Sequence, residues 1–153
     1  MDYLIYFCAV ILPWVLGIGL VGYFVVTKKK IAALRLIGLS FLSALIAWFI
    51  VSLYKYNFPS PRPFEVLTNL KPLFVTGRGD AFPSGHATFM GALAIGVFLQ
   101  NKKLGLVFIA GAIIITIARV LANVHWPIDV VAGLLWGALV SIAAWLIFRR
   151  FSL

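Results

Sequence analysis

Long uncharged apolar runs dominate this chain and limit what it can fold into. Three of them reach or exceed the length needed to cross a bilayer, namely residues 3–27, 36–54 and 130–148. Two shorter runs, residues 87–101 and 104–118, become spans if the polar residues at their outer ends are included. Mean hydropathy is +1.09, and 63% of the residues are hydrophobic against 11% charged, far above the apolar share of a soluble domain. The pattern predicts a polytopic membrane protein.

We therefore predict an all-α transmembrane helical bundle that forms a single domain over residues 1–153. The five expected spans are residues 4–26, 36–54, 84–100, 104–121 and 127–148. Pro13 is expected to kink the first span. A loop rich in proline and polar residues joins the second and third spans, and its segment 64–70 is expected to form a short interfacial helix.

The formal net charge of +9 raises the question of nucleic-acid binding, but the basic residues lie in short clusters between apolar runs. A nucleic-acid face would need them along one stripe, so we expect no nucleic-acid partner. Five spans divide the cations between the two membrane faces. One face receives Lys28, Lys29, Lys30, Arg35, Lys102, Lys103, Arg149 and Arg150, and the other Lys55, Arg62, Lys71, Arg78 and Arg119.

The more basic face is expected to be cytoplasmic, because positive residues accumulate on the inner side of membrane proteins. The N-terminus would then lie outside and the C-terminus inside a plasma or inner membrane. This topology gathers polar residues from four separate segments at the outer face: Lys55, Arg62, Ser84, His86, Arg119, His125 and Asp129. Both histidines of the chain are among them, which favours a functional site over chance placement.

His125 and Asp129 are four residues apart, so on a helix they would share one face. A carboxylate one turn from an imidazole can hold one ring nitrogen and leave the other free to attack or to transfer a proton. The structural alternative is a chance pair where a helix leaves the membrane. Ionisable residues are costly in hydrocarbon, which makes the pair a functional candidate.

Ser84, Gly85 and His86 open the expected third span. Ser84 is a good N-cap, and Gly85 carries no side chain that would block a ligand from the free backbone N–H groups of the helix start. A capped helix start alone would be unremarkable. His86 in the first turn changes this, because a protonated imidazole beside a bound anion can act as a general acid.

Lys55, Arg62 and Arg119 would add three cations, and arginine matches phosphate oxygens in a two-point fashion. Each has a structural alternative: Lys55 could extend toward the headgroups from a helix end, Arg62 could cap a turn, and Arg119 could pair only with Asp129. The chain's four acidic residues form no cluster in the sequence, and two histidines with one carboxylate are few ligands for zinc. We expect an anion reaction without metal or other cofactor.

Three motifs in this sequence resemble those of a known family. The first is Lys55 followed after six residues by Arg62-Pro63, and the second is Pro83-Ser84-Gly85-His86. The third is Arg119 followed after five residues by His125, which is followed after three residues by Asp129. Together they resemble the three-part signature of the type 2 phosphatidic acid phosphatase (PAP2) superfamily, over about half of the chain. Two departures are visible. Ala118 stands where the family usually has serine, which removes a hydroxyl near the phosphate. Many members have six spans where we count five.

The resemblance implies a lipid phosphatase in which His125 attacks phosphorus and forms a phosphohistidine while Asp129 orients its imidazole. It also implies that His86 protonates the leaving oxygen and then activates water. The resemblance also implies that the substrate phosphate is bound by Lys55, Arg62, Ser84, Gly85 and Arg119. Candidate substrates by resemblance are lipid A 1-phosphate, undecaprenyl diphosphate, phosphatidylglycerophosphate and phosphatidate.

Other functions stay open at this point. A phosphotransferase would use the same intermediate with a second lipid in place of water, and a non-catalytic lipid or anion transporter would use the cations only to bind phosphate. A small scaffolding protein would have no need for this set of residues. The GxxxG pattern of Gly133 and Gly137 indicates close packing within the bundle, with a dimer face as the alternative, so the oligomeric state stays open.

Overall fold

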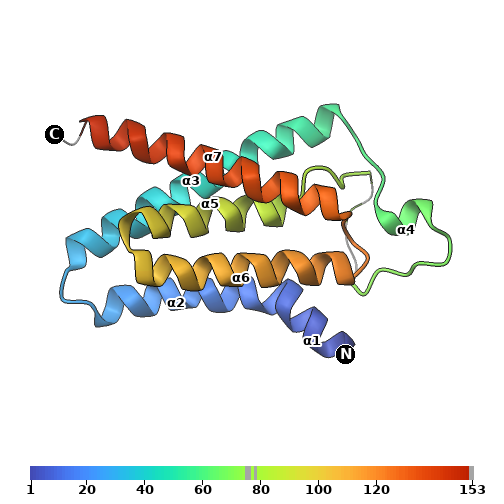
Figure 1. Cartoon of the computed structure of the whole chain (residues 1–153), viewed down its shortest axis with the longest axis horizontal. Coiled ribbons are helices and arrows are strands. Elements are labelled where there is room, and N and C mark those ends of the chain that lie inside the picture. The colour runs from blue at the N-terminus through green and yellow to red at the C-terminus, as the bar shows by residue number, and fades with distance from the viewer. Residues whose placement is uncertain (75–76, 78, 152–153) are drawn as a thin grey trace.

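The fold is helical throughout its regular structure. This computed structural model describes residues 1–74, 77 and 79–151, and within them the only strand-like feature is an isolated bridge between Ser60 and Asp80. The elements in chain order are α1 (Asp2–Tyr6), η1 (Phe7–Ile11), α2 (Leu12–Val26), α3 (Lys30–Asn57), α4 (Pro63–Val66), α5 (Gly85–Gln100), α6 (Lys102–Leu121) and α7 (Pro127–Phe151) (Figure 1). The predicted all-α class is confirmed.

Among the described residues, four helical segments are long and apolar enough to cross a membrane. They are Asp2–Val26, Lys30–Asn57, Lys102–Leu121 and Pro127–Arg150. The first combines α1, the π-helical turn η1 and α2, and it bends between α1 and α2 (Figure 1). Pro13 lies just after η1, in the first turn of α2. Both a proline and a π-turn disturb the regular hydrogen bonding of a helix and so account for the bend.

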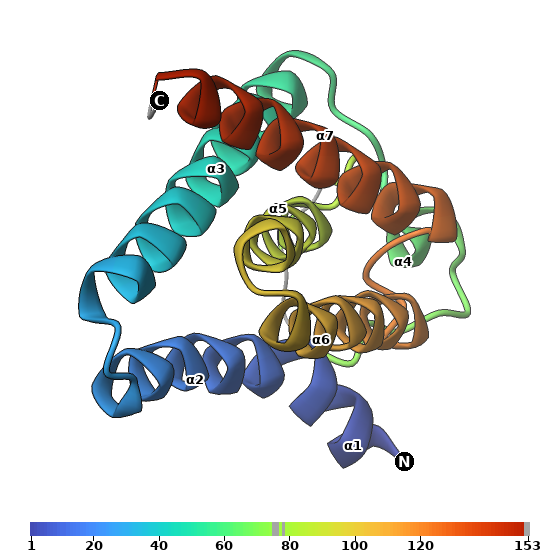
Figure 2. The same ribbon diagram turned by 60° about the vertical axis from the view of Figure 1, so that its left-hand side comes forward.

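The predicted count of five spans is not confirmed, because α5 has only 16 residues. At 1.5 Å per residue it is about 24 Å long, shorter than a hydrocarbon core of about 30 Å. Its position explains how a short helix fits into the bundle. α5 packs mainly against α3, α6 and α7, and Figure 2 shows it in the middle of the helices around it.

Small residues allow α7 to approach α5 closely. A Cβ added at Gly137 would overlap the Thr88 carbonyl oxygen, and one added at Gly133 would lie 2.7 Å from the Ser84 carbonyl oxygen. A Cβ at Gly91 of α5 would in turn meet the Leu134 carbonyl oxygen at 2.9 Å. The GxxxG pattern therefore packs α7 against α5 inside the bundle, as expected. The contact sets the position of the start of α7, where Asp129 lies.

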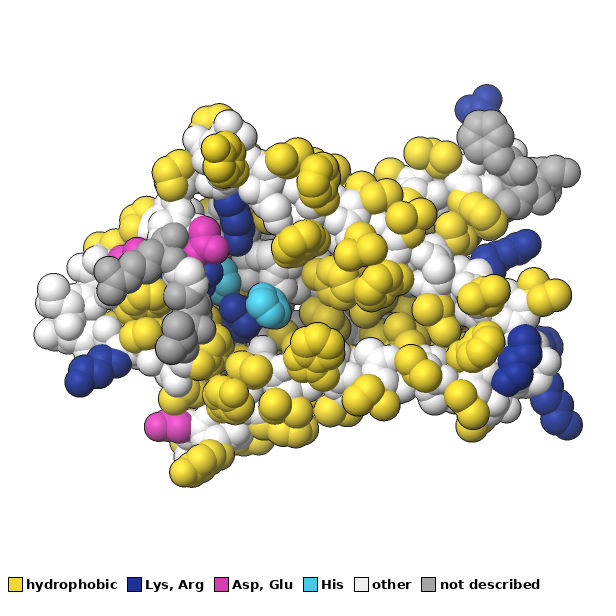
Figure 3. Space-filling model, turned by 180° about the vertical axis from the view of Figure 1, so that it is seen from behind, with side chains coloured by type: hydrophobic (Ala, Val, Ile, Leu, Met, Phe, Trp, Pro, Cys, Tyr) yellow, Lys and Arg dark blue, Asp and Glu magenta, His cyan; other side chains and the backbone are white. Residues whose placement is uncertain are grey.

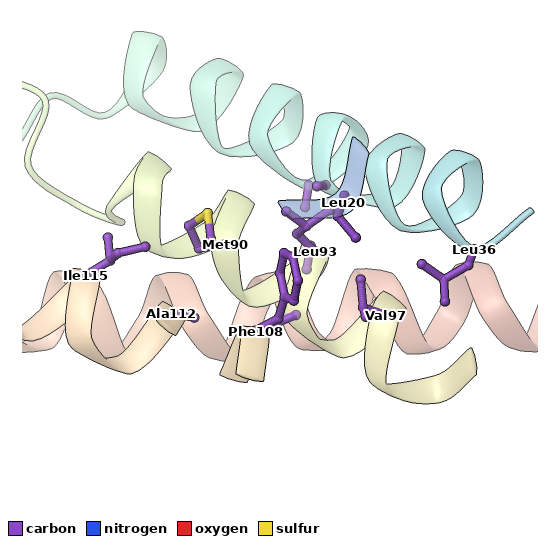
Figure 4. Close-up of a cluster of buried hydrophobic side chains, with 12 residues drawn as sticks. Leu20, Leu36, Met90, Leu93, Val97, Phe108, Ala112 and Ile115 are labelled. Atoms are coloured by element: carbon purple, nitrogen blue, oxygen red, sulfur yellow. The ribbon is translucent and has the colours of Figure 1, made fainter. Parts of the chain in front are cut away.

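A cluster of buried apolar side chains joins α5 to the helices around it. Leu93 and Val97 of α5 lie beside Phe108 of α6, Leu20 of α2 and Leu36 of α3 (Figure 4). In water, burying one such side chain stabilises the folded state by about 1.5–3 kcal/mol. In a bilayer the surrounding lipid is apolar as well, so close packing between helices contributes more than the exclusion of water. The cluster holds α5 in a fixed place between its neighbours.

The second expected span, residues 36–54, lies within a longer helix, since α3 begins at Lys30 and ends at Asn57. The Lys30 ammonium donates to the carbonyl oxygens of Phe24 and Val25 and so connects the start of α3 to the end of α2. The expected helix over 64–70 is confirmed only in its first turn, since α4 ends at Val66. The two chain termini lie at opposite ends of the long axis (Figure 1).

Candidate active site

The start of α5 has the capped geometry that the sequence indicated. Ser84 is the N-cap, its hydroxyl oxygen accepts from the Ala87 backbone N–H at 3.5 Å, and its side chain is fully buried. Ser84 also donates its own backbone N–H to the Asp129 carbonyl oxygen at 2.9 Å, which ties the start of α5 to the start of α7. His86, in the first turn, lines a pocket with Gly85.

The turn between α6 and α7 holds His125 against Asp129. The His125 Nδ1 atom lies 3.4 Å from the Asp129 Oδ2 atom, and both side chains are buried. The same carboxylate oxygen accepts the Trp126 backbone N–H at 2.8 Å, so Asp129 caps its own helix as well. With Nδ1 directed to the carboxylate, Nε2 of His125 is left on the pocket side.

A network of contacts fixes Arg62 beside His125. Its guanidinium donates to Asp80 from Nε and from Nη2, each at 2.9 Å, and from Nη1 to the Val124 carbonyl oxygen at 2.6 Å. The Nη1 atom also lies 3.5 Å from His125 Nε2. Glu65 accepts the backbone N–H groups of Arg62 and Gly79, which braces the loop around the guanidinium. Sequence analysis missed Asp80 and Glu65 as supports of this arginine.

Lys55 and Arg119 complete the group of cations. A Cβ placed on Gly85 would lie 3.8 Å from the Lys55 Nζ atom, so this ammonium lies against the start of α5. Arg119 is 5% exposed, and its guanidinium lies 5.6 Å from the Phe74 ring centroid. Among the buried side-chain nitrogens and oxygens of the described residues, Arg119 Nε alone has no hydrogen-bond partner. A buried donor without a partner is costly, and a bound anion would satisfy it.

One pocket of about 740 Å³ collects these groups. Its polar lining includes most of the residues expected from the sequence, namely Lys55, Arg62, Gly85, His86, Arg119 and His125, together with Asp80. Ser84 and Asp129 are not among the lining residues, but each adjoins one of them. Ser84 precedes Gly85 in the chain, and the Asp129 carboxylate contacts His125. Figure 3 shows histidine and basic side chains in a hollow framed by hydrophobic ones. Arg78, expected at the same face, lies outside the described residues.

Apolar residues make up another part of the pocket wall. Ala9, Val10 and Trp14 come from the first span, and Trp48 comes from α3. Trp14 is 73% exposed and Trp48 is 46% exposed, so this part of the wall lies at the surface of the bundle. The pocket thus joins a cationic floor to an apolar side, a combination that suits an amphipathic ligand.

Burial lowers the pKa of His125 to about 4, and the hydrogen bond with Asp129 opposes this effect. The positive charges of Arg119 and Arg62 lower the pKa further. The imidazole is therefore neutral near pH 7, as a nitrogen nucleophile must be. Within the described residues no group of three His, Cys, Asp or Glu side chains could hold a metal ion.

The fold and this site define a class of membrane protein. The chain matches the family model of the PAP2 superfamily over residues 35–152, more than half of its length, and it belongs to that family. The computed fold is also similar to the crystal structure of Aquifex aeolicus LpxE, with a TM-score of 0.75 and 26% identity over 94% of this chain and 84% of the other.

Curated relatives agree with this assignment. The chain is 31% identical to the bacitracin transport permease protein BcrC of Bacillus licheniformis (88% of this chain, 66% of the relative) and 32% identical to the undecaprenyl-diphosphatase of Sulfolobus acidocaldarius (70% and 53%). It is 39% identical to the lipid A 1-phosphatase of Rhizobium johnstonii (48% and 30%). The chain spans less than two thirds of the length of each of these relatives.

Proposed function

We propose that this protein is a membrane phosphatase that hydrolyses a lipid phosphate or diphosphate through a phosphohistidine intermediate. The observation that carries the proposal is the pair of His125 and Asp129, with Nε2 beside the cationic pocket and Nδ1 held by the carboxylate. Membership of the PAP2 superfamily, and relatives named as phosphatases of lipid A and undecaprenyl diphosphate, support the same reaction class.

In the first step Nε2 of His125 attacks the terminal phosphorus in line, and the bond from phosphorus to the leaving oxygen breaks, releasing the lipid alcohol from a monophosphate or the lipid monophosphate from a diphosphate. His86 gives its proton to that oxygen. A bound phosphate brings negative charge next to His86, which favours the protonated form that this step needs. Asp129 stabilises the positive charge that develops on the phosphorylated His125 ring.

In the second step His86 accepts a proton from water, and the water oxygen attacks phosphorus. The phosphorus–nitrogen bond breaks, free phosphate leaves, and the His125 imidazole is restored. Arg62, Arg119, Lys55 and the backbone N–H groups at the start of α5 would hold the equatorial oxygens in both steps. The Arg119 Nε atom, which has no partner among the described residues, supports this role, because phosphate would supply its missing acceptor.

The apolar side of the pocket supports a lipid substrate. A phosphate on the cationic floor would leave its acyl or polyprenyl chain beside Trp14 and Trp48, where the wall reaches the surface of the bundle. We further propose that α5 is a fifth crossing held inside the others. The N-terminus and the site then lie at the outer face of the plasma or inner membrane and the C-terminus inside, in line with the more basic end of the bundle.

The test is phosphate release from a panel of lipid phosphates and diphosphates in detergent containing EDTA. We expect turnover that vanadate inhibits and that His125→Ala abolishes. Substantial turnover by His125→Ala would contradict the nucleophile assignment.

A phosphotransferase would pass the phosphoryl group to a second lipid, and it would release less phosphate when that lipid is present. A non-catalytic transporter is the other candidate, since one relative is named a transport permease. It would release no phosphate from any member of the panel.

A further inference from the structure

A second pocket, of about 570 Å³, lies at the opposite end of the bundle from the candidate active site. α2 ends there, α3 and α6 begin there, and α7 ends there, so the pocket lies where the candidate spans meet the polar boundary of the membrane. Its wall includes three cations, Lys29, Arg35 and Arg149, from the turn before α3, from α3 and from α7.

The guanidinium groups in this pocket rest on aromatic rings. The Arg35 Cζ atom lies 5.4 Å from the Phe148 ring centroid, and the Arg149 Cζ atom lies 5.3 Å from the Trp145 ring centroid. Stacking of this kind restricts the side chains and leaves the N–H edges free to bind an anion in a two-point fashion. The aromatic rings therefore help to preorganise two cations about one pocket.

No carboxylate neutralises these cations within the described part of the chain. All four acidic residues, Asp2, Glu65, Asp80 and Asp129, lie toward the other end, and the ion pairs found are Arg62–Asp80 and His125–Asp129. Among the other basic residues at this end, Lys30 is already engaged, because its ammonium donates to the carbonyl oxygens of Phe24 and Val25. The pocket is thus strongly positive.

We propose that this pocket binds the phosphate headgroup of an anionic phospholipid from the leaflet at this end of the bundle. Gln100 and Asn101 add polar groups to the wall, while Leu36, Leu39 and Trp145 provide apolar surface for the start of the acyl chains. Basic pockets between spans are suited to such headgroups. Free phosphate would use the cations but would gain nothing from the apolar wall, so the lipid fits the pocket better.

Native mass spectrometry of the detergent-solubilised protein tests the site with phosphatidylglycerol, phosphatidylcholine of the same chains, and inorganic phosphate. We expect the wild-type protein to bind phosphatidylglycerol about tenfold more tightly than phosphatidylcholine, and millimolar inorganic phosphate to leave the bound lipid in place. Equal binding of the two lipids, or displacement by inorganic phosphate, would overturn the proposal. These ligand comparisons use only the wild-type protein.

The variant arm compares two double substitutions that remove the same charge from the same end. Arg35→Gln with Arg149→Gln should weaken phosphatidylglycerol binding about tenfold, while Lys103→Gln with Arg150→Gln, outside the pocket lining, should change it less than about threefold. Equal losses in the two pairs would mean that general surface charge binds the lipid, and the pocket would be rejected.

A third variant separates this pocket from the candidate active site. Arg119→Gln should leave phosphatidylglycerol binding unchanged; if it removes the lipid while the Arg35/Arg149 pair does not, the lipid sits in the active-site pocket and the inference fails. Phosphate release tests the proposed enzyme activity separately, so the two proposals can fail independently.

Discussion

The His125 Nδ1 atom lies 3.4 Å from the Asp129 Oδ2 atom, within a buried turn where the same carboxylate oxygen also accepts the Trp126 backbone N–H. The Asp129 side chain therefore has two structural roles. Asp129 caps α7, and it directs His125 so that Nε2 remains on the side of the pocket. Asparagine keeps the shape and an oxygen for the cap but loses the negative charge, which allows the two functions to be tested separately.

Asp129→Asn should lower kcat for phosphate release by about 10²-fold or more, because the proposed phosphohistidine would lose its counter-charge. The melting temperature should change little, since an amide oxygen can still accept the Trp126 N–H. Asp2→Asn is the matched control, because Asp2 is exposed in α1, outside the pocket lining. An Asp129→Asn protein with wild-type kcat would show that the carboxylate has no part in the reaction.

The protonation of His125 can be followed without a substrate. Because burial lowers its pKa from an ordinary value of 6.5 to about 4, the imidazole should stay neutral, and reactive toward diethyl pyrocarbonate, until the pH falls to about 4. The His86→Ala variant leaves His125 as the only histidine, so mass spectrometry reads one site. A modification midpoint near pH 6.5 would contradict the expectation.

A second variant tests the direction in which Asp129 shifts the pKa of His125. The hydrogen bond to Asp129 raises the pKa of His125 against the lowering by burial, so adding Asp129→Asn should move the midpoint to still lower pH. A midpoint that moves upward would mean that the carboxylate does not contact the imidazole in solution.

Arg119 and Arg62 should respond differently to replacement by lysine. Arg119→Lys should reduce kcat/KM by about tenfold or more, as expected when a bidentate charged contact to phosphate is lost. Its melting temperature should change little because Nε has no partner within the described structure. Arg62→Lys should reduce both activity and melting temperature, because Arg62 also binds Asp80 and the Val124 carbonyl oxygen.

Arg150→Lys, at the opposite end of the bundle and outside the lining of both pockets, is the matched activity control for both arginines. We expect it to leave kcat/KM within about twofold of wild type, since a single surface contact is worth little. Equal loss of stability in Arg119→Lys and Arg62→Lys would contradict the difference in their contacts.

Gly137→Ala should destabilise the protein by about 1–3 kcal/mol, the usual cost of overpacking. The added Cβ would overlap the Thr88 carbonyl oxygen, and α7 must move away from α5 to relieve this contact. Since α7 carries Asp129, activity should fall with stability. Gly22→Ala is the control, because no atom of the described residues lies within 4 Å of a Cβ there. Similar melting temperatures for the two variants would contradict the close packing.

Much of the fold and of the candidate site could be predicted from the sequence. Helices were predictable because uncharged apolar runs in a membrane leave the backbone no other way to satisfy its hydrogen bonds. The convergence of His86 and His125 was predictable because alternate loops of a bundle return to the same end. Both residues do line one pocket.

Contacts between loops were not predictable. Asp80 lies 18 residues after Arg62, and their ion pair depends on the path of the intervening chain, which turns at Gly79 with a φ of 64°. Glu65 joins the same network through backbone N–H groups, which leave no trace in a residue pattern. The bounds of α5 were predicted closely, but the count of five spans is not confirmed, because hydropathy cannot tell a span that meets lipid from a short helix enclosed by others.

By itself the sequence determined which segments are helical, which end of the bundle collects the candidate site residues and which end is most basic. These depend on local composition and on the alternating direction of successive helices. Only the tertiary structure decided that α5 lies at the centre, that Arg62 is held by Asp80, and that Arg35 and Arg149 meet around one pocket. Each of these depends on how close one helix comes to another, and that distance is set by packing of side chains far apart in the chain.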